Sequence, residues 1–443
     1  MMQSNKPSKT IVLFSIVLAA TGFAFCILAC YPGLMSPDSL DQYHQAKSGL
    51  YADWHPPIMA WIWSKLLWIN DGPLPMMMLI NLLYWSAVAI IAIKLKRFWL
   101  SCIFLVLSFS PPLINFIGLI WKDTLLFSFL FFISAVIFWL YNNYLNKFLS
   151  ILLFLIITSL SFVAIMIRHN AASALIGILA LAILVLFKNT KPIIALLLGF
   201  AFTLSLFFAG QKVNSKLCNH ISQHPEQQMM LYDLLGISQQ ARINLFPAYL
   251  KNKITLDTID RIYNHHDGGM YLIFAMHLVT ENDMQLEQIK TAWKDALIQY
   301  PRFALVHKYE NFEAVQKHPL AVKYSYIDPS NFDTAIITKN AFRKVFRDIN
   351  ESETAHKFYV PNDYFYGCLI IILISLIAYW KTKNQSLFLP VFTALSGFLY
   401  SGSYFLLSPC NELRYNYWTI GAFFLSFFFL LNAFTNRVTK RSQ

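Results

Sequence analysis

Charged side chains are scarce in this chain of 443 residues. Asp, Glu, Lys and Arg make up 13% of it, whereas hydrophobic residues make up 57%. A soluble domain carries about a quarter charged residues, so the composition excludes an ordinary soluble globular protein. The net charge of +12 is no sign of nucleic-acid binding, because a basic collar around membrane helices suits an anionic membrane surface.

Two kinds of ligand site also lack support in the sequence. No glycine-rich phosphate-binding loop occurs, which argues against a nucleotide-sugar substrate. The six cysteines form no disulfide framework, although Cys218 and Cys410 are both expected outside the membrane and their pairing stays open. Cys218, His220 and His224 have metal-ligating side chains but no fourth ligand at a suitable spacing. We therefore expect no metal site and no cofactor, and leave dependence on a divalent metal open.

Long apolar runs are what the sequence does contain. Most are near 20 residues, which is long enough to cross a bilayer. They predict an all-α polytopic membrane protein with about ten transmembrane helices. Pro111-Pro112 interrupts the third run, and prolines in a membrane helix mark a kink. The expected spans are 11–30, 75–93, 99–118, 124–141, 148–167, 171–187, 192–209, 363–380, 385–407 and 414–434.

Basic and acidic residues divide unequally between the two sides of these spans. Lys and Arg gather in the short loops on one side, which the positive-inside rule assigns to the cytoplasm together with both termini. All 23 acidic residues and all 11 histidines then fall on the outer side. If the chain is an enzyme, its acid–base chemistry therefore takes place on the outer face.

The sequence divides into three parts. Residues 1–209 form a block of seven helices that includes a polar first outer loop at 31–74. Residues 210–361 form a polar outer segment, in which apolar residues at spacings of three and four predict a mainly helical domain. At about 150 residues, this segment can bury a core of its own. Residues 362–443 add three closing spans.

Asp38 is the first candidate for catalysis. It follows the first span in the sequence Ser36-Pro37-Asp38-Ser39. A carboxylate close to the membrane surface can take a proton from an acceptor hydroxyl. The same sequence is also a good helix start, in which Asp38 or Ser39 would act as the N-cap. On chemistry alone, the general base and the cap remain equal alternatives.

Three further outer loops each carry a cation. The motifs are Trp121-Lys122-Asp123, Arg168-His169-Asn170 and Arg414-Tyr415. Lys and Arg at this depth can hold a phosphate, and Arg can do so with two hydrogen bonds. Taken singly, such a cation is more often an anchor that reaches the membrane interface. Three such loops on one face favour a joint phosphate site.

The first outer loop resembles that of bacterial polytopic glycosyltransferases of the GT-C superfold. The likeness rests on 32–39, on Gln42-Tyr43 and Gln45-Ala46, and on Asp53-Trp54-His55-Pro56-Pro57. The nearest group is that of the serotype-converting O-antigen glucosyltransferases, and the three cation motifs are similar to further motifs of such proteins. Over 210–361 the likeness is confined to 231–237. Where many members have two adjacent acids, this chain has Asp38-Ser39.

The resemblance implies an inverting transfer of a sugar. The donor would be a hexose such as glucose on polyprenyl phosphate, the acceptor a surface polysaccharide or lipid-linked glycan, and the place the outer face of the bacterial inner membrane. Asp38 would be the general base and His55 would orient Asp38 or the sugar. Lys122, Arg168 and Arg414 would bind the donor phosphate. Further substrate contacts are expected from Asp53, Trp54, Asp123, His169, Asn170 and Tyr415.

Two other function classes remain as alternatives. One is a flippase or transporter of a polyprenyl lipid or glycan, and the other is a non-catalytic factor of envelope assembly that uses the outer segment as a docking surface. A transporter typically carries ionisable residues within its spans near the midplane. The spans of this chain hold almost none, which argues against ion-coupled transport.

Overall fold

The fold is helical throughout the part of the chain that the computed structural model describes. Those residues are 8–143, 146–187, 189–220, 222–263, 273–274, 276–319, 340–407 and 411–441. Within them there are 20 α-helices and no sheet, and the β-structure of these residues is one isolated bridge between Leu34 and Leu119. Eight of these helical segments are long and apolar enough to span a membrane, so the chain is a multi-pass membrane protein. Cys410, the candidate partner of Cys218, lies outside the described residues.

The long apolar helices follow the predicted spans closely. Short 3-10 turns, η2 (Gln385–Leu387) and η3 (Leu413–Asn416), lead directly into the last two helices. The eight are α1 (Lys9–Cys30), α4 (Leu74–Lys94), α7 (Lys122–Tyr141), α8 (Lys147–Ile167), α10 (Pro192–Leu217), α20 (Pro361–Thr382), α21 (Phe388–Leu407) and α22 (Tyr417–Arg441). The predicted span at 171–187 forms α9 (Ala171–Leu186), an apolar helix of only 16 residues.

The predicted span at 99–118 is wrong. The chain there forms α5 (Phe98–Leu107) and the four-residue α6 (Pro111–Ile114). A proline lacks a backbone N–H and clashes with the carbonyl four residues earlier, and it holds the preceding residue in an extended conformation; Ser110 is extended accordingly. After α6 the chain turns toward the first outer loop, where the backbone N–H of Ile120 donates to the carbonyl of Leu34 at 2.9 Å.

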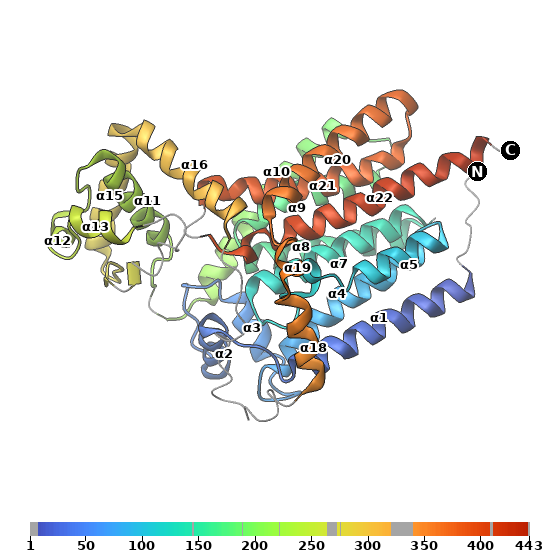
Figure 1. Cartoon of the computed structure of the whole chain (residues 1–443), viewed down its shortest axis with the longest axis horizontal. Coiled ribbons are helices and arrows are strands. Elements are labelled where there is room, and N and C mark those ends of the chain that lie inside the picture. The colour runs from blue at the N-terminus through green and yellow to red at the C-terminus, as the bar shows by residue number, and fades with distance from the viewer. Residues whose placement is uncertain are drawn as a thin grey trace.

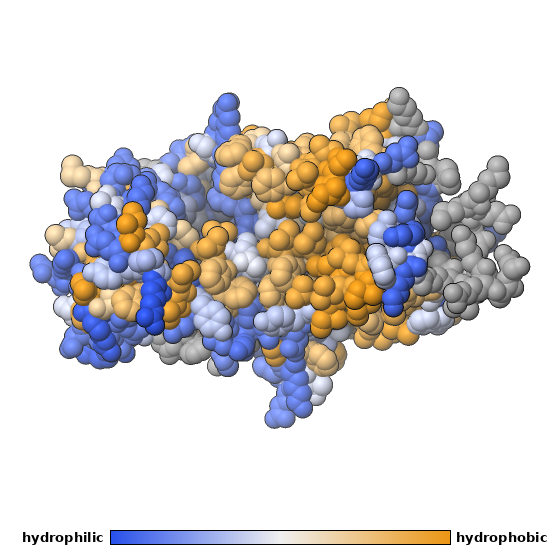
Figure 2. All heavy atoms as spheres, turned by 90° about the horizontal axis from the view of Figure 1, so that it is seen from above, coloured by the Kyte–Doolittle hydropathy of each residue, from blue (hydrophilic) through white to orange (hydrophobic). Residues whose placement is uncertain are grey.

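The helices of the bundle differ in how deeply they are buried. Of the most apolar stretch of each helix, 83% is buried in α7 but only 22% in α8 and in α10. Figure 1 shows the long helices running side by side, with α7 among them and α1 at one edge. Helices at the edge of the bundle, such as α8 and α10, therefore expose apolar side chains on its surface. Figure 2 shows this apolar surface over the bundle and hydrophilic surface over the outer segment at the left.

Much of the outer segment is helical and has its own hydrophobic core. α11 (Gln227–Ala241), α15 (Asp283–Gln299) and α16 (Pro301–Lys317) follow the helical spacing of the sequence. Shorter helices, α12 (Ala248–Lys251) and α13 (Leu256–Ile262), pack against the same core. α16 also reaches the bundle, where Gln316 donates to the hydroxyl of Ser401 at 2.7 Å.

The end of the outer segment belongs to the bundle. α18 (Ala341–Asn350) and α19 (Glu353–His356) precede α20. The side chains of Phe346, Ala355 and Tyr359 are buried in the core of the membrane helices. Residues 340–361 are thus packed on the bundle rather than on the core around α11.

Candidate functional site

The carboxylate of Asp38 does not cap the helix that contains it. α2 (Pro37–Ser48) begins after Ser36, whose side chain accepts from the backbone N–H of Ser39, while Ser39 Oγ accepts from the backbone N–H of Ser36 at 3.2 Å. Ser36 is therefore the N-cap, and the alternative that Asp38 or Ser39 caps this helix is wrong. Asp38 lies in the first turn, where the helix dipole favours a negative charge.

Arg414 is the closest partner of Asp38. Its Nη1 lies 2.9 Å from Asp38 Oδ2. The same guanidinium contacts the carboxylate of Glu412 and lies 4.0 Å from that of Asp123, and it stacks over the ring of Trp121 at 4.5 Å. The Arg414 side chain is 11% exposed whereas that of Asp38 is 34% exposed, so a substrate can reach the acid more easily than the cation behind it.

His55 lies between Lys122 and Asp38 and is close to both. Lys122 Nζ lies 2.7 Å from His55 Nδ1, and His55 Nε2 lies 3.7 Å from Asp38 Oδ1. Burial lowers the pKa of His55 to about 3, and the neighbouring Lys122 cation acts in the same direction. The imidazole is therefore neutral near pH 7. With the Lys122 ammonium as the donor to Nδ1, the imidazole proton would sit on Nε2 and face Asp38.

The charge state of Asp38 follows from these neighbours. Burial by itself would raise the pKa of its carboxyl, but Arg414, His55 and Lys122 together hold the pKa well below its usual range. Opposite charges within a few ångströms favour the ionised form of an acid. Asp38 is therefore a carboxylate at neutral pH, about two-thirds shielded from solvent and paired with the Arg414 guanidinium.

Arg168 and Asp123 form a buried ion pair beside this cluster. Arg168 Nε also donates to Asn170 Oδ1 at 3.1 Å, and its guanidinium lies 5.0 Å from the centre of the Tyr415 ring. A buried ion pair is stable only when further hydrogen bonds and contacts satisfy both groups. Arg168, Asp123, Asn170 and Tyr415, which were predicted as site residues from three separate loops, are thus brought together.

His169 lies on the neighbouring side, against α10. Its ring centre is 6.2 Å from that of Phe207. Burial lowers the pKa of His169 to about 4, helped by the Lys122 and Arg168 cations. His169 is therefore neutral near pH 7, like His55.

Asp53 and Trp54 make their contacts elsewhere. The carboxylate of Asp53 accepts from the backbone N–H of Gln223 at 2.7 Å and from the hydroxyl of Ser222. The Trp54 ring packs edge-on against Phe274 at 5.2 Å. Both side chains tie the first outer loop to the outer segment. Their predicted contact with substrate stays a prediction.

Three contributors to the cluster were given no role from the sequence, although Trp121 and Glu412 lie in or beside two of the outer-loop motifs. Glu412 contacts Arg414, and the sequence indicated this contact only in that Glu412 lies two residues before Arg414. Trp121 carries the Arg414 guanidinium on its ring and donates from Nε1 to Ser36 Oγ at 2.6 Å. Tyr404 stacks on Tyr415 with ring centres 5.1 Å apart; its signal was a phenol placed at the end of a predicted span.

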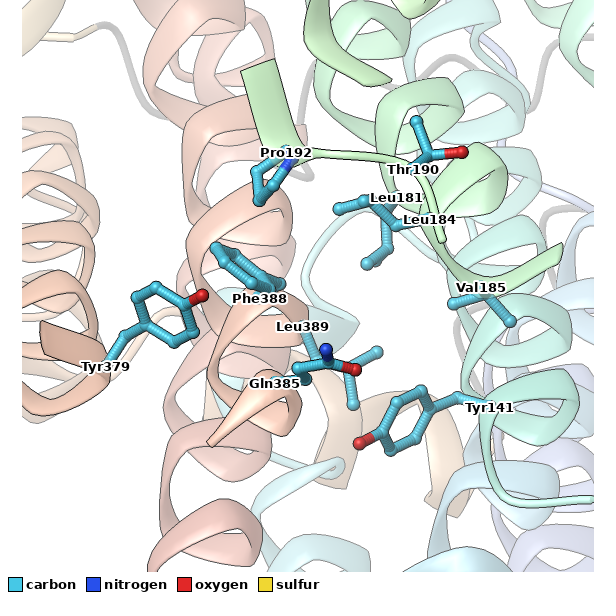
Figure 3. A pocket seen from close by; sticks show the side chains of 10 residues that line it. All are labelled: Tyr141, Leu181, Leu184, Val185, Thr190, Pro192, Tyr379, Gln385, Phe388 and Leu389. Atoms are coloured by element: carbon cyan, nitrogen blue, oxygen red, sulfur yellow. The ribbon is translucent and has the colours of Figure 1, made fainter. Parts of the chain in front are cut away.

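Two further features of the described residues, metal-ligand clusters and a separate cavity, add nothing to this site. No group of three or more His, Cys, Asp or Glu side chains among these residues is arranged to hold a metal ion. A cavity of about 90 Å³ lies between α9, α20 and α21 and is lined by Tyr141, Tyr379 and Phe388 among others (Figure 3). Tyr141 ends the helix that Lys122 begins, so this cavity is roughly 28 Å from the Asp38 cluster along α7.

Comparison with known proteins adds no relative to this picture. No family model, no curated protein and no solved structure matches the chain. The chemistry of the site is therefore argued from its own residues.

Proposed function

We propose that this chain is an inverting hexosyltransferase of the GT-C type that uses a polyprenyl-phosphate sugar. It would act at the outer face of the bacterial inner membrane, with both termini in the cytoplasm. One observation carries the proposal. The ionised Asp38 lies 2.9 Å from Arg414, and its other carboxylate oxygen lies 3.7 Å from His55, which in turn contacts Lys122. An acid and several cations at the ends of membrane helices suit a sugar that arrives on a lipid phosphate.

The reaction needs one proton acceptor and stabilisation of one leaving group. The oxygen of an acceptor hydroxyl, on a glycan or lipid-linked glycan, forms a bond to the anomeric carbon while the bond from that carbon to the donor phosphate breaks. Asp38 takes the hydroxyl proton as general base. Attack opposite the leaving phosphate inverts the anomeric centre. Preorganised cations are suited to the charge that develops on the phosphate, and Lys122, Arg168 and Arg414 would supply them.

Arg414 would link donor binding to the strength of the base. A carboxylate whose pKa is held far below neutral is a weak proton acceptor. A donor phosphate that engages the Arg414 guanidinium would weaken its pair with Asp38, and the pKa of Asp38 would rise toward a useful range. His55, whose Nε2 lies 3.7 Å from Oδ1, would keep the carboxylate oriented during this exchange.

The remaining site residues would shape the pocket rather than take protons. Asp123 holds Arg168 in place, and Asn170 and Tyr415 fix the plane of its guanidinium. His169 is neutral beside them and can offer a hydrogen bond to a sugar hydroxyl. The acidic partners of the cluster, Asp38, Asp123 and Glu412, balance its three cations, which makes burial of so many charges tolerable.

Transfer from a labelled donor tests this function. The full chain, purified in detergent, is given a polyprenyl-phosphate hexose with a radiolabelled sugar and a surface-polysaccharide acceptor. We expect label in the acceptor and free polyprenyl phosphate in equal amounts. A chain that instead moves intact donor between the leaflets of vesicles, without breaking the sugar–phosphate bond, is a flippase. A chain that does neither fits the assembly-factor alternative.

A further inference from the structure

α18 (Ala341–Asn350) exposes large apolar side chains on one side. Phe342, Val345 and Ile349 are 48%, 49% and 38% exposed. With 3.6 residues per turn, these three positions lie within roughly 60° of arc on the helix surface. Lys344 and Arg347 lie on the other side of the helix and are exposed, together with Asp348, whose Oδ1 lies 3.5 Å from Nη2 of Arg347. Such a division between an apolar face and a charged face with more cations than acids is typical of helices that lie in a membrane interface.

The helix is fixed at the end of a membrane span. The side chain of Asn340 accepts from the backbone N–H of Phe342 at 2.9 Å and donates to the carbonyl of Leu28, near the last turn of α1. Phe346 is buried and packs on Phe25 of α1, with ring centres 6.2 Å apart. Figure 1 shows α18 crossing this end of α1.

The neighbouring surface of α1 indicates what covers the apolar face. Leu28 is itself 46% exposed, and only 28% of the apolar stretch of α1 is buried within the protein. The exposed side chains of α18 therefore continue a surface that a bilayer covers. A large apolar patch in this position, flanked by cations, fits lipid chains and anionic headgroups better than water.

We propose that α18 is an interfacial anchor for an anionic phospholipid surface. Phe342, Val345 and Ile349 enter the upper part of the lipid chains, and Lys344 and Arg347 stay at the level of the headgroup phosphates. The anchor fixes the depth of α1, which leads into the loop that holds Asp38. This inference needs only that the chain spans a membrane, and it holds whether or not Asp38 transfers a sugar.

Depth measurements on single-cysteine labels test the anchor. Val345→Cys and Ile349→Cys are compared with Lys344→Cys as the control from the same helix, in full-length protein in which Cys102, Cys218 and Cys410 are replaced by Ser. Each carries an environment-sensitive fluorophore in vesicles of phosphatidylcholine and phosphatidylglycerol. We expect lipid-attached nitroxides to quench the labels at 345 and 349 at least about threefold more strongly than the label at 344, which aqueous iodide should quench instead.

Two results would overturn the anchor. Quenching of all three labels by iodide would put α18 in water, and shielding of the label at 345 from both quenchers would mean that a second protein surface covers it. A separate comparison tests the preference for anionic lipid. Lys344→Gln combined with Arg347→Gln should remove any difference in lipid quenching at 345 between vesicles with and without phosphatidylglycerol. If the parent shows no such difference, the preference for anionic lipid is wrong.

The unaltered chain provides a check that no substitution can disturb. A phospholipid with a photoactivatable group near the top of its acyl chain is included in the same vesicles, and the peptide that contains 341–350 is analysed by mass spectrometry after illumination. We expect adducts on Phe342, Val345 or Ile349. Adducts on α1 without any on α18 would contradict the proposal.

Discussion

The guanidinium of Arg414 lies 2.9 Å from the carboxylate of Asp38, although 376 positions separate the two residues in the chain. Asp38 follows the first membrane helix and Arg414 immediately precedes the last. The candidate site is therefore complete only when both ends of the bundle have come together. This contact also decides the electrostatics of the site, because it holds Asp38 ionised.

Replacing Arg414 should cost activity even when the charge is kept. Arg414→Lys loses the planar fork that contacts Asp38 and Glu412 together, so we expect transfer at limiting donor to fall by about tenfold or more. Lys122→Ala and Arg168→Ala should also weaken use of the donor. Initial rates over a range of donor concentrations provide the measurement.

The matched control for this series is Arg242→Lys. Arg242 pairs with Asp260 on the exposed surface of the outer segment, where such a pair contributes little. Arg242→Lys should behave as wild type. Normal kinetics for Arg414→Lys, Lys122→Ala and Arg168→Ala would leave these three cations with a structural role only, as buried partners of Asp38, His55 and Asp123.

Asp123 should matter for stability as much as for activity. Its side chain is 1% exposed and pairs with Arg168, so Asp123→Asn leaves a buried guanidinium without its counter-charge. Breaking such a pair costs roughly 3–5 kcal/mol. We expect a clearly lower unfolding temperature in detergent. Glu412→Gln, at a 24% exposed position beside Arg414, should cost less, and an equal loss for both would contradict this ranking.

Acid should destabilise the protein through its buried histidines. The pKa of His55 is about 3 in the folded chain, whereas an unfolded histidine titrates near 6.5. Stability from the neutral imidazole is therefore fully present above about pH 6.5 and is lost as the pH falls toward 3. By pH 5 the loss reaches at most ~2 kcal/mol for one histidine. The depressed pKa of Asp38 acts only at lower pH.

Thermal unfolding between pH 7 and pH 5 measures this effect. The wild type should unfold at lower temperature at pH 5, and His55→Gln should show a shallower pH dependence. His169, whose pKa is also lowered, accounts for part of the slope that remains. A wild type that gains stability on acidification would mean that His55 is charged in the folded chain.

Reporter fusions test the orientation of the bundle. A reporter that is active only outside the cytoplasm should work when fused after Trp121, His169, Lys317 or Glu412, because all acids and histidines are predicted on that side. The same reporter should be silent after Arg97, Lys191 or Lys383, in the basic loops. Activity after Lys383 would break the scheme.

The membrane helices could be predicted from the sequence because each apolar run carries its own signal. α1, α4 and α7 begin and end within two residues of the predicted spans. The failure at 99–118 has a local cause, since hydropathy counts Pro111-Pro112 as part of a run that the backbone cannot continue. This break shapes the candidate site, because the chain bends back to Leu34 and places Trp121 and Lys122 beside the first loop.

The candidate site was predictable only in part. Motif positions singled out Asp38, Lys122, Arg168 and Arg414, but they did not reveal which acid pairs with which cation. The pairs Arg414 with Asp38 and Arg168 with Asp123 depend on how distant helices pack. The N-cap of α2 is Ser36 rather than Asp38, because the helix begins at Pro37, two residues earlier than a cap at Asp38 requires.

The central claim is that Asp38 is the general base of sugar transfer. The most direct test compares Asp38→Asn with Asp41→Asn, which lies one turn further along α2 on an exposed position and accepts from Gln45 within the same helix. Both proteins are brought to equal amounts in detergent, and sugar transfer from the polyprenyl-phosphate donor is followed. We predict that Asp38→Asn loses about a hundredfold or more in rate, as expected for loss of a positioned base, while Asp41→Asn stays near wild type. Full activity of Asp38→Asn would contradict the account.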